Sequence, residues 1–172
     1  MKRILAILLL AALSVGGYAQ QRDFPQRNEL VVLESDNETL EIFKDKDHQY
    51  FLSVGHLGVG DEVVQVYFDP VFELFIPLGS NVSEALETLQ QLQALSKDTP
   101  GTSIEMPGCL ALGFPTEERE PVRITCRKAF LCRHLLFSVE REGYVRATTV
   151  TKSNIGSLVT SLKLHKKFHP ND

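Results

Sequence analysis

The sequence predicts an α+β protein in which one unit, four antiparallel strands followed by a helix, is used twice. The first observation is a repeat, because residues 80–89, SNVSEALETL, return 73 positions later as residues 153–162, SNIGSLVTSL. The second is that both copies follow two β-branched and aromatic runs joined by a turn, Asp-Pro at 69–70 and Glu-Gly at 142–143. The third is an apolar stripe at helical spacing in each copy. A fixed period of this kind is typical of a tandem duplication.

The two predicted helices set the layering of the molecule. An amphipathic helix is stable in a small domain only when its apolar stripe packs on another element. We therefore expect both helices to pack on one face of the strands. The strands could form one curved eight-stranded sheet or two separate four-stranded sheets, and the sequence leaves both arrangements open.

The chain begins with the three parts of a secretory signal peptide. Two basic residues at 2–3 precede an apolar run at 4–13, and small residues lead to a cleavage site between Ala19 and Gln20. The apolar run is too short to span a bilayer, and no later run approaches that length. We expect residues 1–19 to be removed, and the mature chain to have no membrane span and to reach a bacterial periplasm or the exterior.

The mature chain divides into a leader and two units. The leader, residues 20–37, is polar and contains a short edge strand. The first unit spans residues 38–100 and the second spans residues 109–172, with a linker at 101–108. Strands are expected at 40–43, 49–54, 63–68 and 71–76 in the first unit, and at 109–114, 122–127, 135–140 and 144–150 in the second.

Each unit ends in its helix. Asn81 is the predicted N-cap of the first helix, and Glu84 three residues later completes a capping box. The second helix is expected to start after Asn154. An offset of 73 residues without gaps also sets Phe51 against Ile124 and Val66 against Val139.

Charge is distributed unequally between the halves. Residues 20–100 hold 5 Lys and Arg against 15 Asp and Glu, whereas residues 101–172 hold 11 against 7. This asymmetry suggests an acidic partner for the basic half. The simpler interpretation is two solvated surfaces that diverged in charge. The acidic balance of the whole exported chain argues against nucleic-acid binding.

The predicted contact surface is the sheet face opposite the helices, called the open face from here on. Strand alternation places Leu74 and Ile76 on the helix side, but Leu52 and Thr148 on the open face. The alternative is that the strand at 30–33 or another segment covers this face, and a one-residue error in register would swap the two faces. Tyrosine and arginine are frequent anchors of interfaces. The predicted contact residues are Tyr50, Tyr67, Phe75, Arg123, Arg127, Tyr144 and Arg146.

All three cysteines fall in the second unit, and an exported chain can form disulfides. Cys109 and Cys126 lie on strands that should pair, so we expect a bridge between them. A bridge between Cys126 and Cys132 competes with it, and either pairing leaves one thiol over. Cys132 also shares a strand face with His134, which is the spacing for a nucleophile and its base.

Two other patterns are weak signals of chemistry. His165 and His169 stand one helical turn apart, a spacing that can hold a metal, but cations at a helix C-terminus also interact favourably with its dipole. The glycines at 55–60 are followed by a strand rather than by the helix that a phosphate loop requires. We expect no metal and no cofactor.

The sequence therefore favours a non-enzymatic binding or accessory protein that contacts a protein or other ligand through its open face. A thiol-dependent or hydrolytic enzyme centred on Cys132 and His134 is one alternative, and a structural homodimer is another. The duplicated sheet-plus-helix plan is similar, in architecture and repeat length, to small secreted bacterial inhibitors of the β-lactamase-inhibitor type. Because one fold hosts many functions, the resemblance implies a scaffold rather than an activity.

Overall fold

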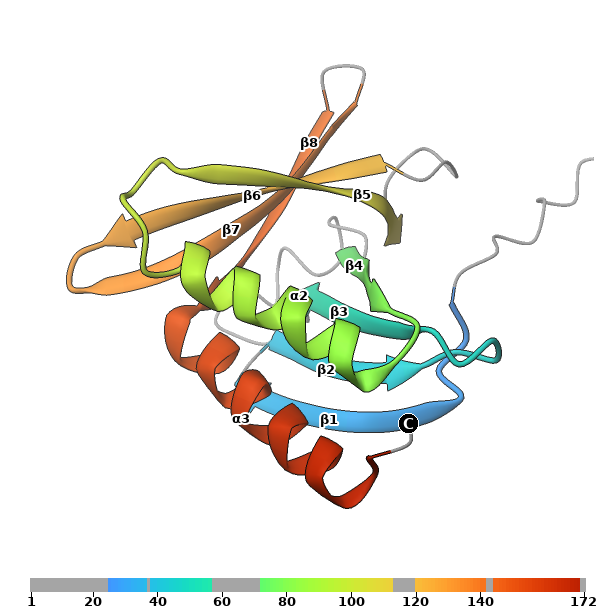
Figure 1. Ribbon diagram of the computed structural model, residues 1–172. Helices are drawn as coiled ribbons and strands as arrows, with labels where there is room; N and C mark the ends of the chain where they lie inside the picture. The colour runs from blue at the N-terminus through green and yellow to red at the C-terminus, as the bar shows by residue number, and fades with distance from the viewer. Residues whose placement is uncertain (1–24, 37, 57–71, 113–119, 142–143, 171–172) are drawn as a thin grey trace, which may run out of the picture.

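A computed structural model describes residues 25–36, 38–56, 72–112, 120–141 and 144–170. The protein is α+β, with an eight-stranded antiparallel sheet and, within the described residues, two helices (Figure 1). The strands lie in the sheet in chain order. The elements are β1 (Glu29–Asp36), β2 (Glu38–Lys44), β3 (Tyr50–His56), β4 (Phe72–Gly79), α2 (Val82–Leu95), β5 (Ser103–Leu112), β6 (Glu120–Ala129), β7 (Cys132–Arg141), β8 (Tyr144–Thr151) and α3 (Lys152–Phe168).

The sheet is continuous but narrow at its middle. β4 and β5 share a short ladder in which Glu73, Leu74 and Phe75 pair with residues 110–112. Beyond this junction the halves turn toward each other, because β8 contacts β3 and α3 contacts β1, β7 and β8. The sequence left one sheet and two sheets open, and the structure shows one.

A single main core lies between the strands and the helices. Alternate residues of the strands, such as Ile42 on β2 and Ile124 on β6, belong to the same buried cluster as Leu89 of α2 and Leu158 of α3. Figure 1 shows α2 and α3 side by side, and the two helices contact each other. Burying a Leu or Ile side chain contributes about 1.5–3 kcal/mol, so this cluster fixes how the two halves of the sheet meet.

The start of α2 confirms the predicted capping box. The Asn81 side chain accepts hydrogen bonds from the N–H groups of Ser83 and Glu84, both at 3.0 Å. The Glu84 carboxylate accepts one from the Ser80 N–H at 2.7 Å. Gly79 has φ +140°, and a Cβ there would collide with Glu84. Glycine is therefore required where the chain turns from β4 into the helix.

The start of α3 differs from its predicted counterpart. The N-cap is Thr151, whose hydroxyl accepts a hydrogen bond from the Asn154 N–H at 3.1 Å. Asn154 thus lies inside the first turn, whereas Asn81 precedes its helix. The 73-residue offset also does not match equivalent strand positions. It sets Phe51 against Ile124, but Ile124 faces the main core and Phe51 belongs to a separate cluster. Val66 lies outside the described residues.

Two boundaries also differ from those expected. β1 is a full strand of eight residues, although the sequence suggested only a short edge strand in the leader. β5 begins at Ser103, inside the stretch expected to be a linker. The Pro-Gly pair at 107–108 suggested a break, but it is accommodated where the β5–β6 register shifts between Met106 and Cys109.

Candidate binding surface

The half of the open face formed by β2, β3 and β4 is filled by the chain itself. Arg27, just before β1, forms ion pairs with both Glu41 and Glu73. The Ser53 hydroxyl donates a hydrogen bond to Glu73. The side chains of Glu41 and Glu73 are only 10% and 12% exposed, whereas Arg27 is 43% exposed. Two carboxylates are thus held under one guanidinium.

Aromatic rings complete this covered layer. Phe43 stacks on Phe51 and meets Phe75 edge-on, with ring centroids 5.8 and 6.2 Å apart, and Leu110 joins the same cluster. The Arg27 guanidinium carbon lies 5.3 Å from the ring centroids of both Phe43 and Phe75. Burial would lower the pKa of Arg27, but the hydrogen bond to Glu41 and the charges of both glutamates raise it above its ordinary value. This layer is a closed, ion-paired surface.

The predicted contact residues in this half are not available as contacts. Phe75 lies on the open face as expected, but it is only 2% exposed. The assignment of Tyr50 and Leu52 to the open face was wrong, since both belong to the main core. Leu52 pairs with Ile76, and directly paired residues share a face. Tyr67 lies outside the described residues.

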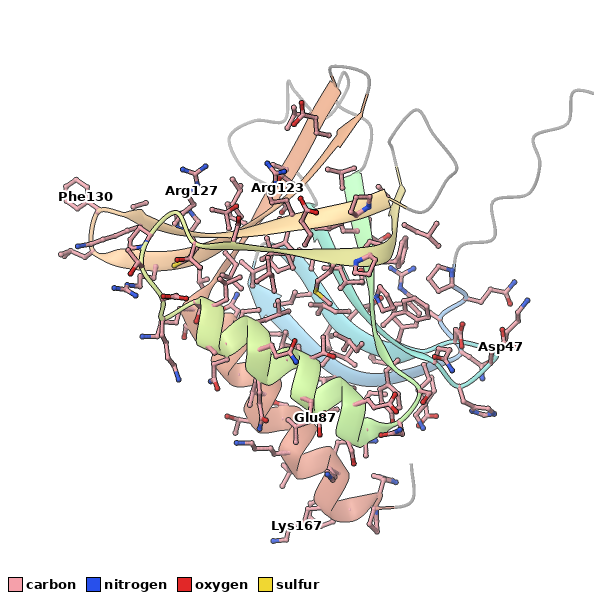
Figure 2. All side chains as sticks on the ribbon, turned by 45° about the horizontal axis from the view of Figure 1, so that its top comes forward. Asp47, Glu87, Arg123, Arg127, Phe130 and Lys167 are labelled. Atoms are coloured by element: carbon pink, nitrogen blue, oxygen red, sulfur yellow. The ribbon has the colours of Figure 1, made fainter. Side chains whose placement is uncertain are left out.

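The other half of the open face is accessible along β6. Arg123 and Arg127 are both exposed, and Figure 2 shows them pointing away from the helices. Arg123 pairs with Glu105 at 3.1 Å, but both side chains are about 60% exposed. Ion pairs at such exposure contribute little to stability. These two arginines are the predicted contact residues that the structure places on an accessible surface.

For the predicted contact residues on β8, Tyr144 and Arg146, the structure describes the backbone register alone. Arg146 is in register with Val139, and Tyr144 with Arg141; their side chains are not among those described. The assignment of Thr148 to the open face was wrong. It pairs with Phe137 of the main core and is 5% exposed.

The most exposed apolar side chains lie at the tip where β6 turns into β7. Phe130 and Leu131 form a two-residue turn between the paired residues Ala129 and Cys132. They are 98% and 91% exposed. Phe130 also has φ +55°, the left-handed conformation that bulky residues disfavour by about 1–2 kcal/mol. Figure 2 shows Phe130 at the outer end of the hairpin.

Basic residues face each other directly behind this tip. Lys128 pairs with Arg133 across the strands, and Arg127 pairs with His134. Alternation places the first pair on the helix side and the second on the open face, so basic groups surround the tip on both faces. Like charges directly opposite each other destabilise a sheet. Arg133 Nη1 also donates to the carbonyl of Asp98 at 2.7 Å, which ties the hairpin to the end of α2.

A basic cavity of about 590 Å³ opens directly behind the hairpin tip, beside Cys132 and Arg133. Its charged lining residues are Lys97, Arg133 and Lys152, and the first turn of α3 contains no acidic residue. Asn154 also lines it and is only 5% exposed. Among the described residues, none accepts from or donates to the Asn154 side-chain amide. The cavity therefore combines positive charge with an uncommitted amide.

None of the three cysteines, all within the described residues, is in a disulfide, so the predicted bridge was wrong. β5 and β6 do pair, but Cys109 lies opposite Glu120, whereas the Cys126 N–H bonds the carbonyl of Thr102. Six residues of strand separate these positions, roughly 20 Å, and a disulfide requires Cα atoms within about 7 Å. The competing pair fails too, because Cys126 is buried in the main core and Cys132 is exposed.

Cys132 and His134 lie on the same face of β7, as the sequence predicted. Cys132 is exposed and His134 is half-buried. Across the described ranges, no hydrogen bond joins them. The geometry brings a thiol and an imidazole near each other without the contact that activates a nucleophile.

The remaining histidine pattern forms a ring stack. His165 and His169 are stacked with ring centroids 4.5 Å apart at the end of α3. No group of three metal-ligating side chains occurs in the part of the chain that the structure describes. Neither described helix has the length and apolar character needed to cross a membrane.

Sequence reasoning missed the hairpin tip. The predicted strands ended at residue 127 and resumed at 135, so the turn between them was left unassigned. The signal was present, because an adjacent Phe-Leu pair is flanked by Arg127-Lys128 on one side and Cys132-Arg133-His134 on the other. We call residues 127–134 the hairpin end.

Comparison with known proteins does not identify a relative. No protein-family model matches the chain, and neither a curated protein nor a solved structure matches it.

Proposed function

We propose that this is a non-enzymatic binding protein whose contact surface is the hairpin end, extended along β6 by Arg123. The observation that carries the proposal is the pair of almost fully exposed apolar side chains, Phe130 and Leu131, set beside facing pairs of basic residues. A fold selected for stability alone would avoid each of these features. Where local rules are broken together without a structural gain, function is the usual cause.

The other half of the open face is covered by the chain itself, which supports the choice of the hairpin end as the contact surface. The layer under Arg27 leaves Phe43, Phe51 and Phe75 buried. Exposed apolar patches rimmed by polar groups usually mark interaction sites. Arg127 and Phe130 belong to residue types that anchor interfaces.

Capture from a cell-envelope extract tests the proposal. The variant Arg127→Ala/Phe130→Ser should lose capture by tenfold or more, on the order of one anchor residue. The matched control Lys163→Ala/Leu164→Ser removes an exposed cation and an exposed apolar side chain from α3. The control should capture normally. Equal capture by both variants, each verified as folded by circular dichroism, would contradict the proposal.

Export belongs to the same proposal. The predicted cleavage after Ala19 would release a mature chain that begins at Gln20 and meets its partner in the periplasm or outside the cell. We also retain the tandem duplication of two strand-and-helix units, with both helices on one face, as the proposed origin of the scaffold. The order of four strands and a helix, repeated once, supports it.

A thiol-dependent enzyme is the second candidate, because Cys132 is exposed and unbridged on the same strand face as His134. Its test is the rate of reaction of Cys132 with a thiol probe as a function of pH. A rate that is unaffected by His134→Ala would eliminate it. A homodimer formed through the open face would instead appear as a concentration-dependent mass in sedimentation, lost in Arg123→Glu.

A further inference from the structure

The hairpin end combines exposed apolar side chains with basic residues, which is the chemistry that binds an anionic phospholipid bilayer. We propose that Phe130 and Leu131 enter the interface of such a bilayer while the surrounding cations contact its phosphate groups. This inference rests on the proposed function and names the partner class of the same surface.

The shape of the tip favours a bilayer over a protein. Phe130 and Leu131 are almost fully exposed at a turn of two residues. A protein interface buries its apolar anchors on one face and surrounds them with a polar rim. A protruding apolar tip has its two side chains buried together when it enters a fluid, planar interface.

The charge distribution matches the same surface. Lys128 and Arg133 lie on one side of the hairpin, and Arg127 and His134 lie on the other. A bilayer with anionic headgroups meets both sides at once, so all of these groups approach phosphates together. Asp98 is a nearby acidic residue, and its carboxylate accepts a hydrogen bond from the Thr99 N–H at 2.8 Å. Contact with the phosphates therefore relieves the repulsion between the facing cations Lys128 and Arg133.

The cavity directly behind the hairpin tip supplies a place for a headgroup. It starts at Cys132, directly after the apolar pair, and is lined by Lys97, Arg133 and Lys152. Residues 151–154 at the N-terminus of α3 line the cavity, and a helix N-terminus favours a phosphate. The buried amide of Asn154, uncommitted within the described chain, adds a neutral donor. A phosphodiester fits this donor set.

The experiment uses the absence of tryptophan from the sequence. In Leu131→Trp the mature protein carries a single tryptophan at the tip, and Val145→Trp is the control at another exposed apolar position. With vesicles of equal phosphatidylglycerol and phosphatidylcholine, emission of the tip tryptophan should shift to the blue and be quenched by brominated acyl chains. The control tryptophan should not change.

Affinity measured by vesicle sedimentation separates the two contributions. Phe130→Ser/Leu131→Ser should weaken binding at least tenfold, whereas Leu164→Ser/Phe168→Ser, which removes two other exposed apolar side chains, should leave it unchanged. Arg127→Ala/Lys128→Ala should weaken binding on the order of 30-fold, and Lys166→Ala/Lys167→Ala much less. Binding should also fall as salt is raised.

Two results would overturn the inference. One is an absence of binding to anionic vesicles, and the other is binding that tip and control variants share equally. Suppose that the protein does not bind anionic vesicles while capture of a protein from the extract still depends on Arg127 and Phe130. In that case the proposed function stands and the bilayer is the wrong partner. If neither depends on the tip, both proposals fail.

Discussion

Lys128 on β6 lies directly opposite Arg133 on β7, one residue pair inside the Phe130-Leu131 turn. Two cations face each other where a sheet would gain from opposite charges. The same hairpin places a phenylalanine in a left-handed conformation. The chain thus carries two local costs at one exposed end, and both are measurable as free energies of unfolding.

The first prediction concerns Phe130. Phe130→Gly should raise the free energy of unfolding by about 1 kcal/mol, because glycine adopts positive φ without steric cost. Leu131→Gly is the control, since Leu131 lacks positive φ. It should be neutral or destabilising. Urea denaturation measures both, and equal destabilisation by the two glycines would refute the strain at Phe130.

The second prediction concerns the facing cations. Lys128→Glu should stabilise the protein by about 0.2–1 kcal/mol, because it replaces a repulsive cross-strand pair with an attractive one. Lys128→Gln should give a smaller gain. Both effects should shrink at high salt, where exposed charges are screened. A loss of stability in Lys128→Glu at low salt would show that the two groups do not repel.

The third prediction concerns the covered half of the open face. Arg27→Ala should destabilise the protein by about 2 kcal/mol, because it leaves the largely buried carboxylates of Glu41 and Glu73 without a counter-charge. Two adjacent carboxylates without a counter-charge repel each other, and this repulsion is absent when one of them is neutral. The variant should therefore recover stability as the pH is lowered, and adding Glu41→Gln should recover part of it at neutral pH. A pH-independent loss in thermal denaturation would contradict the ion-pair layer.

The fourth prediction concerns the capping box. The hydrogen bond from the Ser80 backbone N–H, followed by that from the Ser80 hydroxyl, lowers the pKa of Glu84 below its ordinary value of 4.5. A depressed folded-state pKa contributes stability above the unfolded pKa, and this contribution is lost as the pH falls through the folded value. Carboxyl titration by NMR should place Glu84 below the other exposed glutamates. In Ser80→Ala, which removes the hydroxyl donor, the value should move up.

The fifth prediction concerns the thiols. The native protein should present one fast-reacting thiol, Cys132, and two that react only on unfolding, Cys109 and Cys126. Cys132→Ser should abolish the fast phase. If the native protein showed its reactive thiol only after a reductant had been added, a disulfide would be present in it.

The sequence predicted what depends on neighbouring residues. The cap at Asn81 and Glu84 was confirmed because it is formed within one helical turn. The α+β class followed from alternation and helical periodicity. The register of paired strands was harder to predict, since the sequence indicates which strands can pair but not which residues lie opposite each other. The Cys109–Cys126 bridge failed for that reason, because a shift near Met106 sets the two residues far apart.

Burial and exposure were the least predictable. Tyr50 was assigned to the wrong face, because alternation alone cannot say which parity faces the core. Nothing local links Arg27 to Glu73, which lies 46 residues later. The Phe130-Leu131 pair resembled core residues in composition, and only the pairing of β6 with β7 shows that they form the tip.

The most direct measurement is site-specific photo-cross-linking in cells of the native producer, with a photoreactive amino acid at position 130 or, as control, at the exposed position of Glu87 on α2 (Figure 2). Specific adducts, to a lipid or a protein, should form from position 130 and none from position 87. Adducts from position 87 alone, or equal labelling from both, would contradict the claim that the hairpin end is the contact surface.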